Sequence, residues 1–545
     1  MTFNGVTFGV FMVLFVLVTG MGFVASRWRR AKNEHQLDEW ALGGRGFGGF
    51  ITWFLLGGDL YSAYTLIAVP AAIFSIGAFG FYAVPNAVVL YSLGFLFLPR
   101  LVRLAHKKGY VTLTDFVNDR FKSQALGLAI TLTGLLATLP YLALQLVGLE
   151  VVFASMGIQA GPTASWIVRD LPLFIAFGVL AAYTYSSGIR APALIAFLKD
   201  GLTYIVVIVA VIVIPIKLGG FGQIFADAGA AIADRTNSPD PEAAAISVNA
   251  SVYMTLALGS GMAFFLYPHA ITGVFAARGA RTVRRNMSVL PIYTVLLGFV
   301  ALLGMMALAA GIKPLNGNPQ FAVPQLLQQM FPSWFVGVAY AAIAMSALVP
   351  AAIMAIGAGN LVSRNIIRQF SRSETTSRRE TEISKVVSVL VKLGALVFVL
   401  TLDSQFALNF QLLGGIWILQ TIPTVLLGLF TERFADKRAL LAGWAVGIAY
   451  GTIAAYNVSS PKASHFGGST AAPFFLSSPM YIAISALVLN LVVTLVWSGI
   501  TSTLRRTRQI SATAPVSTTG TVSGTEANSA TNAPAPHDLS GVQLP

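Results

Sequence analysis

The sequence predicts an all-α integral membrane protein with about thirteen transmembrane helices. The chain has 545 residues, of which 56% are hydrophobic and only 10% are charged, and its mean hydropathy is +0.74. A water-facing surface on a chain of this length needs more charge. The apolar residues come in runs of about 20 to 30, long enough to cross a hydrocarbon core of about 30 Å as helices. The runs lack the alternation of polar and apolar residues found in barrel strands. We therefore expect helices, in which the backbone hydrogen bonds are made within each segment.

Each apolar run defines one expected span, bounded by polar residues. The predicted spans are 5–25, 49–77, 79–99, 124–156, 166–187, 193–216, 248–277, 287–311, 334–362, 385–402, 404–430, 439–457 and 479–500. Residues 1–25 are expected to form a first membrane helix, because the basic residues follow this run instead of preceding it as in a signal peptide. Residues 49–430 form the expected core, 439–500 two further helices, and 501–545 a disordered tail rich in Ser, Thr, Ala and Pro.

Basic residues fill every second loop between these spans. They include Arg27, Arg29, Arg30, Lys32, Arg45, Arg100, Arg103, Lys107, Lys108, Arg120, Lys122, Arg190, Arg278, Arg281, Arg284, Arg285, those from Arg364 to Lys385, Arg433, Lys437, Arg438, Arg505, Arg506 and Arg508. The opposite loops hold only Arg169, Lys217, Arg235, Lys313 and Lys462. The positive-inside rule therefore predicts a bacterial inner-membrane protein with its N-terminus outside and its C-terminus in the cytoplasm. The net charge of +14 reflects this topology, and no nucleic-acid partner is expected.

The second span is interrupted near its middle. Two adjacent glycines, Gly57 and Gly58, weaken the helix, and Asp59 follows them directly. A charge at the centre of a span costs about 2.5 to 3.5 kcal/mol on insertion scales, so such residues usually face a functional cavity. Three polar side chains, Tyr61, Tyr64 and Thr65, then share one helical face. The alternative interpretation is close helix packing through the glycines.

A second interruption lies five spans later. Residues 256–269 contain the small residues Gly259, Ser260 and Gly261 and end in Pro268 and His269. The charge pattern makes spans two and seven run in opposite directions, as the first helices of two inverted five-helix repeats would. The repeats are expected at about 49–216 and 248–430. Paired interruptions at matching places are a pointer to a central transport site.

Four segments carry a resemblance to a known family. They are 57–65 (GGDLYSAYT) with 68–70 (AVP), 141–148 (YLALQLVG), 266–273 (LYPHAITG) and 344–351 (AMSALVPA). The chain resembles the sodium:solute symporter family, most closely its bacterial monocarboxylate permeases for pyruvate, lactate and related acids. The resemblance implies a leucine-transporter-like five-plus-five core and a symporter that works by alternating access. It implies no enzymatic activity and no cofactor other than a coupling ion.

The resemblance also implies an ion site between the break in span two and the middle of span nine. The matching ligands are the backbone carbonyls of Gly57, Leu60 and Ile343 and the hydroxyl of Ser346, with Asp59 as the nearby carboxylate. Oxygen ligands of this kind suit sodium. Ala347 stands where sodium-coupled members commonly carry a second hydroxyl residue. A proton carried on Asp59 is therefore the alternative to sodium.

The family's substrate cavity implies a further set of residues. The matching positions are Tyr61, Tyr64, Thr65, Asn86, Gln145, Ser260 and Gln420. Hydroxyls and free amides at an opened helix end can hold a small carboxylate. His269 is expected to donate as well, or else to bond a carbonyl beside Pro268.

Three further ionisable residues lie deep in spans. Lys199 and Asp200 are expected to form a structural pair or part of an inner gate. Lys392 is expected to extend toward the membrane interface.

Three other functions were weighed. A symporter for an amino acid or acetate, coupled to protons, is one alternative, and a transporter-like sensor is another. A membrane enzyme is disfavoured, because the chain has five histidines, no cysteine and no His-x-x-x-His pair.

Overall fold

The computed structural model describes residues 3–25, 37–158, 171–241, 248–371, 376–401, 407–431, 436–460 and 463–513. In this part of the chain the secondary structure is helical except for one short antiparallel pair of strands, β1 (Thr470–Ala471) and β2 (Met480–Tyr481). One compact unit comprises Met1–Gly499, and a second, Ile500–Pro545, begins within the last helix.

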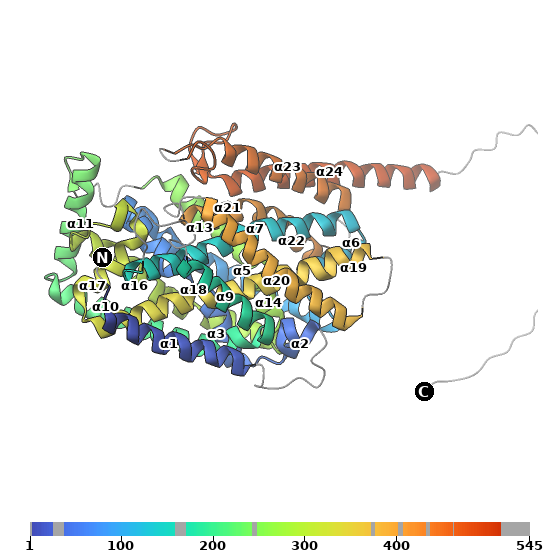
Figure 1. Ribbon diagram of the computed structural model, residues 1–545. Helices are drawn as coiled ribbons and strands as arrows, with labels where there is room; N and C mark the ends of the chain where they lie inside the picture. Colours follow the sequence, from blue (N-terminus) through green and yellow to red (C-terminus); the bar gives the residue numbers. More distant parts are fainter. Residues whose placement is uncertain are drawn as a thin grey trace, which may run out of the picture. The chain divides into compact units, whose positions relative to one another are not determined.

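The α-helices follow one another along the whole described chain (Figure 1). They are α1 (Gly5–Val24), α2 (Leu37–Leu42), α3 (Gly49–Leu60), α4 (Val69–Ile76), α5 (Ala83–Lys108), α6 (Leu113–Phe121), α7 (Gln124–Ser155), α9 (Leu171–Ser187), α10 (Arg190–Lys217), α11 (Phe221–Thr236), α13 (Ala250–Phe264), α14 (Pro268–Phe275), α15 (Ala280–Val289), α16 (Pro291–Ala309), α17 (Ala322–Met330), α18 (Ser333–Val362), α19 (Arg368–Phe370), α20 (Ser377–Thr401), α21 (Ala407–Ile418), α22 (Ile422–Phe430), α23 (Lys437–Tyr456) and α24 (Ile482–Thr513).

Short 3₁₀ and π segments join several of these helices. They are η2 (Gly43–Arg45), η3 (Tyr64–Ala68), η4 (Gly77–Tyr82), η5 (Leu315–Gly317), η6 (Pro319–Phe321), η7 (Ser363–Ile367) and η9 (Leu419–Thr421). Of these, η3 and η7 are π-helical. Such π segments are rare and often lie at functional sites.

Every expected span has a helical counterpart, but not every counterpart is long enough to cross a membrane alone. Among the described residues ten helices have the length and hydropathy of a span, and the bent pair α13 and α14 makes an eleventh. Two expected spans match shorter apolar helices, Gly49–Leu60 and Leu173–Ala182. The number thirteen therefore stays a prediction. At the C-terminal end, α24 continues to Thr513, past residue 500 where the tail was expected to begin, and 514–545 lie outside the described residues.

Helix α18 is the most deeply enclosed element. In its most apolar window all residues are buried, and it packs against α1, α7, α10, α14 and α20 (Figure 1). A helix that is apolar all round is expected in the interior of a bundle. It therefore gives the bundle a central element against which the broken helices are placed.

Both predicted interruptions are present. The residue after α3, Tyr61, leaves the helical region with φ −83° and ψ 85°, and the chain resumes as η3 and α4. Between α13 and α14 the axis bends by 50°. Pro268 begins α14 and Tyr267 before it is extended, with φ −62° and ψ 142°, because a residue that precedes proline avoids the helical region.

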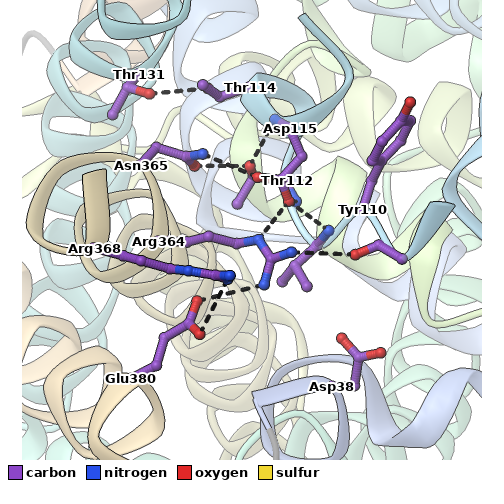
Figure 2. Close-up of polar contacts among 12 residues, drawn as sticks. Asp38, Tyr110, Thr112, Thr114, Asp115, Thr131, Arg364, Asn365, Arg368 and Glu380 are labelled. Atoms are coloured by element: carbon purple, nitrogen blue, oxygen red, sulfur yellow. Dashed lines mark hydrogen bonds and ion pairs between the residues drawn. The ribbon is translucent and has the colours of Figure 1, made fainter. Parts of the chain in front are cut away.

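A polar network fastens the end of α18 to the connection between α5 and α6 (Figure 2). Arg364 in η7 bonds Asp115 at 2.7 Å and Glu380 of α20 at 3.4 Å. Next to it Asn365 donates to Asp115 at 3.0 Å and accepts from Thr112 at 2.7 Å. Asp115 also closes the capping box at the start of α6. Arg364 thus joins α6 and α20, which are distant in sequence, through the carboxylates of Asp115 and Glu380.

The other end of α6 carries a second ion cluster. Asp119 pairs with Lys108 at 2.6 Å and Lys122 at 2.9 Å, and it accepts from the hydroxyl of Tyr110. These donors hold the pKa of Asp119 well below its usual range. Together the two clusters attach α6 to the end of α5.

The charge asymmetry predicts the side of the membrane on which each loop lies. A reporter fused after Arg508 should be cytoplasmic, and one fused after Asp240, which follows α11, should be outside, because basic loops remain in the cytoplasm. Enzymatic reporters that are active on one side of the membrane measure this. The reverse placement would refute both the orientation and the inverted-repeat assignment.

The network around Arg364 predicts a large difference between two neighbouring arginines. Arg364→Gln should lower the free energy of unfolding by about 2 kcal/mol, because Asp115 and Glu380, both mostly buried, would lose a charged partner. Arg368→Gln is the matched control, since Arg368 is half exposed and reaches Glu380 only at 3.6 Å. Thermal unfolding in detergent compares the two. Equal midpoints for both variants would show that the network adds no stability.

Candidate functional site

The break after α3 leaves backbone carbonyls that need partners. The Gly57 carbonyl accepts from the amide of Tyr61 at 3.3 Å, and the Leu60 carbonyl from the amide of Ser62 at 3.1 Å. The hydroxyl of Thr65 donates to the same Leu60 carbonyl at 2.5 Å. Two further carbonyls of this turn, those of Gly58 and Tyr61, accept hydrogen bonds from a side chain of α10.

That side chain is Lys199. Its ammonium donates to the carbonyls of Gly58 at 2.7 Å and Tyr61 at 2.8 Å, and it pairs with Asp200 at 2.8 Å. Lys199 and Asp200 are both fully buried. The expected pair is therefore present, and it contacts the broken helix directly.

A tyrosine of α16 completes this side of the break. The Tyr293 hydroxyl donates to Asp200 at 2.9 Å, while its carbonyl accepts from the hydroxyl of Tyr61 at 2.7 Å. The glycines allow this approach, because a Cβ on Gly57 would lie 2.3 Å from the Tyr293 ring and one on Gly58 would lie 3.1 Å from Asp200. Tyr61, expected to bind substrate, instead joins α3 to α16.

Asp59 faces a different helix. Its carboxylate lies 3.4 Å from Nε2 of His269 at the start of α14, and both side chains are buried. Within the described residues neither ring nitrogen of His269, nor Oδ1 of Asp59, has a hydrogen-bond partner, so the alternative of a carbonyl bond for His269 is not met. Rings of Tyr141 and Tyr267 lie 5.4 Å from the imidazole. Two titratable groups thus face each other in an aromatic enclosure.

The expected ion ligands of α18 lie beside α10. Ser346 is fully buried, and its hydroxyl is 3.3 Å from that of Thr203. Thr203 in turn donates to the carbonyl of Lys199 at 2.9 Å. Ile343 is buried in the same helix, one turn before Ser346. The hydroxyl expected to bind sodium is therefore next to the turn of α10 that carries the lysine.

Polar residues expected to bind substrate gather on the other side of the break. Gln145 of α7 accepts from the amide of Ala63 at 3.0 Å and so stabilises the broken segment. The hydroxyl of Tyr64 is 3.3 Å from that of Tyr82, and it also interacts with Asn86 and Ser260. These hydroxyl and amide groups can donate to a small anion without a buried cation.

A second pair of helices joins this cluster. Asn86 of α5 donates to Ser260 of α13 at 3.1 Å, and Gln411 of α21 reaches the same hydroxyl at 3.4 Å. The structure thus brings Asn86 and Ser260 together, as expected. Gln420 lies apart from them in η9, where it donates to the carbonyl of Ala483 at 3.3 Å and bonds Asn490 of α24. From this part of the chain it is Gln411, not Gln420, that reaches the cluster.

Sequence reasoning missed several of these partners. Gln411, Tyr82 and Thr203 carry no motif, and only their contacts single them out. Lys392 differs from its expectation: its side chain is fully buried, and its Nζ has no hydrogen-bond partner among the described residues, instead of extending to the interface.

Comparison with known proteins identifies the family of this chain. The model of the sodium:solute symporter family matches residues 40–447. A monocarboxylate transport permease protein of Rhizobium johnstonii is 47% identical over 494 residues, 90% of this chain and 96% of the relative. An uncharacterized symporter of Bacillus subtilis, YodF, is 31% identical over 442 residues, 80% of this chain and 85% of the relative.

A solved structure has the same arrangement of helices. A Na⁺-coupled sialic acid symporter, in a substrate-bound outward-open state, gives a TM-score of 0.70 at 15% identity, over 92% of this chain and 98% of that one. This likeness shows the leucine-transporter-like fold with broken first helices. The family match across most of the chain and the 47% identical relative show that this protein belongs to the sodium:solute symporter family.

Proposed function

We propose that this chain, a multi-pass membrane symporter, imports a small monocarboxylate such as pyruvate or lactate across the bacterial inner membrane. A cation gradient drives this import by alternating access. The observation that carries the proposal is the break after α3, where the buried Asp59 and His269 adjoin a cluster of hydroxyl and amide groups. The name of the relative from Rhizobium johnstonii supports the substrate class.

The chemistry of the cluster suits a small carboxylate. Tyr64, Asn86 and Ser260 provide hydroxyl and amide donors, and Gln145 brings a further side-chain amide to the broken segment. A carboxylate needs several such donors once it leaves water. Bulky sugars would need a larger set of paired hydroxyl partners, which favours a substrate of few atoms.

Asp59 is the group that we propose couples the ion to the substrate. Two negative charges, Asp59 and the substrate carboxylate, repel each other strongly where water is excluded. A cation or proton at Asp59 removes this repulsion, so each ligand strengthens binding of the other. The contact with His269 favours the second candidate, a proton-coupled symporter for acetate or an amino acid, because the pair can share a proton.

Substrate competition tests the proposed class. The protein is reconstituted in proteoliposomes, and uptake of labelled pyruvate is measured. Unlabelled lactate or acetate should inhibit this uptake at concentrations about tenfold or more below those needed of proline or a hexose, which corresponds to at least 1.4 kcal/mol of discrimination. Liposomes without protein are the control. A sugar that competes as well as lactate would disprove the monocarboxylate assignment and leave the family assignment intact.

Replacement of Asp59 tests the coupling. Asp59→Asn keeps the shape and removes the charge, so accumulation against a gradient should fall to equilibration. Apparent substrate affinity should weaken about tenfold, within the 1–3 kcal/mol typical of coupling between sites. Accumulation and apparent affinity are measured from uptake driven by a sodium gradient and, separately, by a pH gradient.

Asp234→Asn is the matched control for this experiment, because Asp234 is an exposed carboxylate of α11. It should accumulate substrate like the unmodified protein. Accumulation by Asp59→Asn itself would show that the carboxylate is structural and that another group carries the ion.

A further inference from the structure

The ammonium of Lys199 is fully coordinated by the break after α3. An ammonium has three N–H donors and no acceptor, and three oxygens surround this one: the carbonyls of Gly58 and Tyr61 and a carboxylate oxygen of Asp200. All three distances lie between 2.7 and 2.8 Å. Lys199 has no exposed surface. A full positive charge thus lies where a bound cation would satisfy the carbonyls freed by the break.

The polar groups around Lys199 compensate its positive charge. Asp200 supplies the opposite charge, and its second oxygen is held by the hydroxyl of Tyr293 at 2.9 Å. Of the other polar groups near the pair, Asp59 interacts electrostatically with Lys199, and Tyr204 with Asp200. Burying an ion costs several kcal/mol unless it is paired and hydrogen-bonded; here the two ions are paired, Lys199 donates to two carbonyls, and one oxygen of Asp200 accepts from Tyr293.

Gly57 and Gly58 allow the close contact of α3 with α10 and α16. A Cβ on Gly57 would clash with Tyr293, and a Cβ on Gly58 would press on Asp200 and on the Lys199 side chain at 3.4 Å. Without side chains, α3 can approach α10 and α16 closely enough for its carbonyls to meet the ammonium. Gly57 and Gly58 therefore position the partners of Lys199, besides weakening the helix.

A sodium ion does not fit the ligand set that family resemblance implies. The Leu60 carbonyl already accepts from Ser62 and Thr65, which uses both of its lone pairs. The Gly57 carbonyl accepts the amide of Tyr61. Ser346 is followed by Ala347, so α18 lacks a second hydroxyl, and the nearby Thr203 hydroxyl already donates to the carbonyl of Lys199. An ion there would also lie beside the turn that carries the Lys199 ammonium, and the two positive charges would repel each other in a low-dielectric interior.

We propose that the Lys199 ammonium is the cation of the α3 break in this chain and takes the place of a sodium ion at this position. Because this cation is attached to α10, it cannot leave with the substrate. The ion whose gradient drives uptake must then bind elsewhere, and Asp59 with His269 is the adjacent buried pair. The inference concerns the proposed transport site, but it requires no particular substrate.

Sodium-dependent thermal stability tests the inference without transport. The purified full chain is unfolded in sodium chloride and in choline chloride at equal ionic strength, because a ligand that binds only the folded state raises the midpoint. The unfolding midpoint of Ser346→Ala should respond to sodium in the same way as that of the unmodified protein. Lys199→Ala should unfold at a lower temperature but gain a saturable, sodium-specific rise of about 3 °C, because the carbonyls of Gly58 and Tyr61 and the carboxylate of Asp200 then lack their cation.

Two variants serve as controls. Lys199→Arg keeps the charge and should gain no sodium response. Lys392→Ala removes another fully buried lysine, in α20, and should also gain none.

Two results would overturn the inference. One is a sodium-specific rise of the unfolding midpoint in the unmodified protein that is absent in Ser346→Ala. This comparison can be made even if the lysine variants do not fold. The other is a folded Lys199→Ala protein with no added response to sodium. An uptake experiment that excludes monocarboxylates would leave both measurements valid, so failure of the proposed function is separable from failure of this inference.

Discussion

The carbonyls exposed by the break after α3 are the constraint on which the rest of the site depends. In a membrane interior every backbone polar group needs a partner within the protein, and an interrupted helix lacks several. Here three of these carbonyls accept from side chains: that of Leu60 from Thr65, and those of Gly58 and Tyr61 from Lys199. These partners come from inside the broken segment and from α10. The break is thus maintained by specific bonds, and a mobile solute or ion is not required to hold it.

Two ionic centres on either side of the break have different chemistry. Lys199 and Asp200 form a close ion pair; Lys199 also donates to two carbonyls, and Asp200 accepts from Tyr293. Asp59 and His269 are buried as well, but their closest approach is 3.4 Å and neither ring nitrogen of His269 has a hydrogen-bond partner within the described residues. A close, bonded ion pair stabilises one arrangement of helices, whereas unbonded titratable groups favour binding of a proton or ligand. In the proposed function, structural and transport roles are divided between these two centres, which contact the end of α3 from α10 and from α14.

The helices that carry these centres are held together away from the break. The buried helix α18 contacts both α10 and α14, which supply Lys199 and His269. At its end, Arg364 and Asn365 reach Asp115 on α6 (Figure 2). Alternating access requires helices that move as units, and this network joins α18 to α6 and α20 at one end. The helices that carry Lys199 and His269 therefore pack on one buried helix, which is fixed at its end to α6 and α20.

The sequence by itself determined the membrane class, the helical runs and the two interruptions, because hydropathy, Gly57–Gly58 and Pro268 act through neighbouring residues. It also indicated Asp59, Ser346, Asn86 and Ser260 as polar groups near the site. Only the tertiary structure decided that Lys199 donates to carbonyls about 140 positions away in sequence. It also decided that Asp59 lies beside His269, and that Gln411, not Gln420, bonds Ser260. Such pairings depend on how separate helices pack and rotate against each other, and no local pattern in one helix specifies its partner.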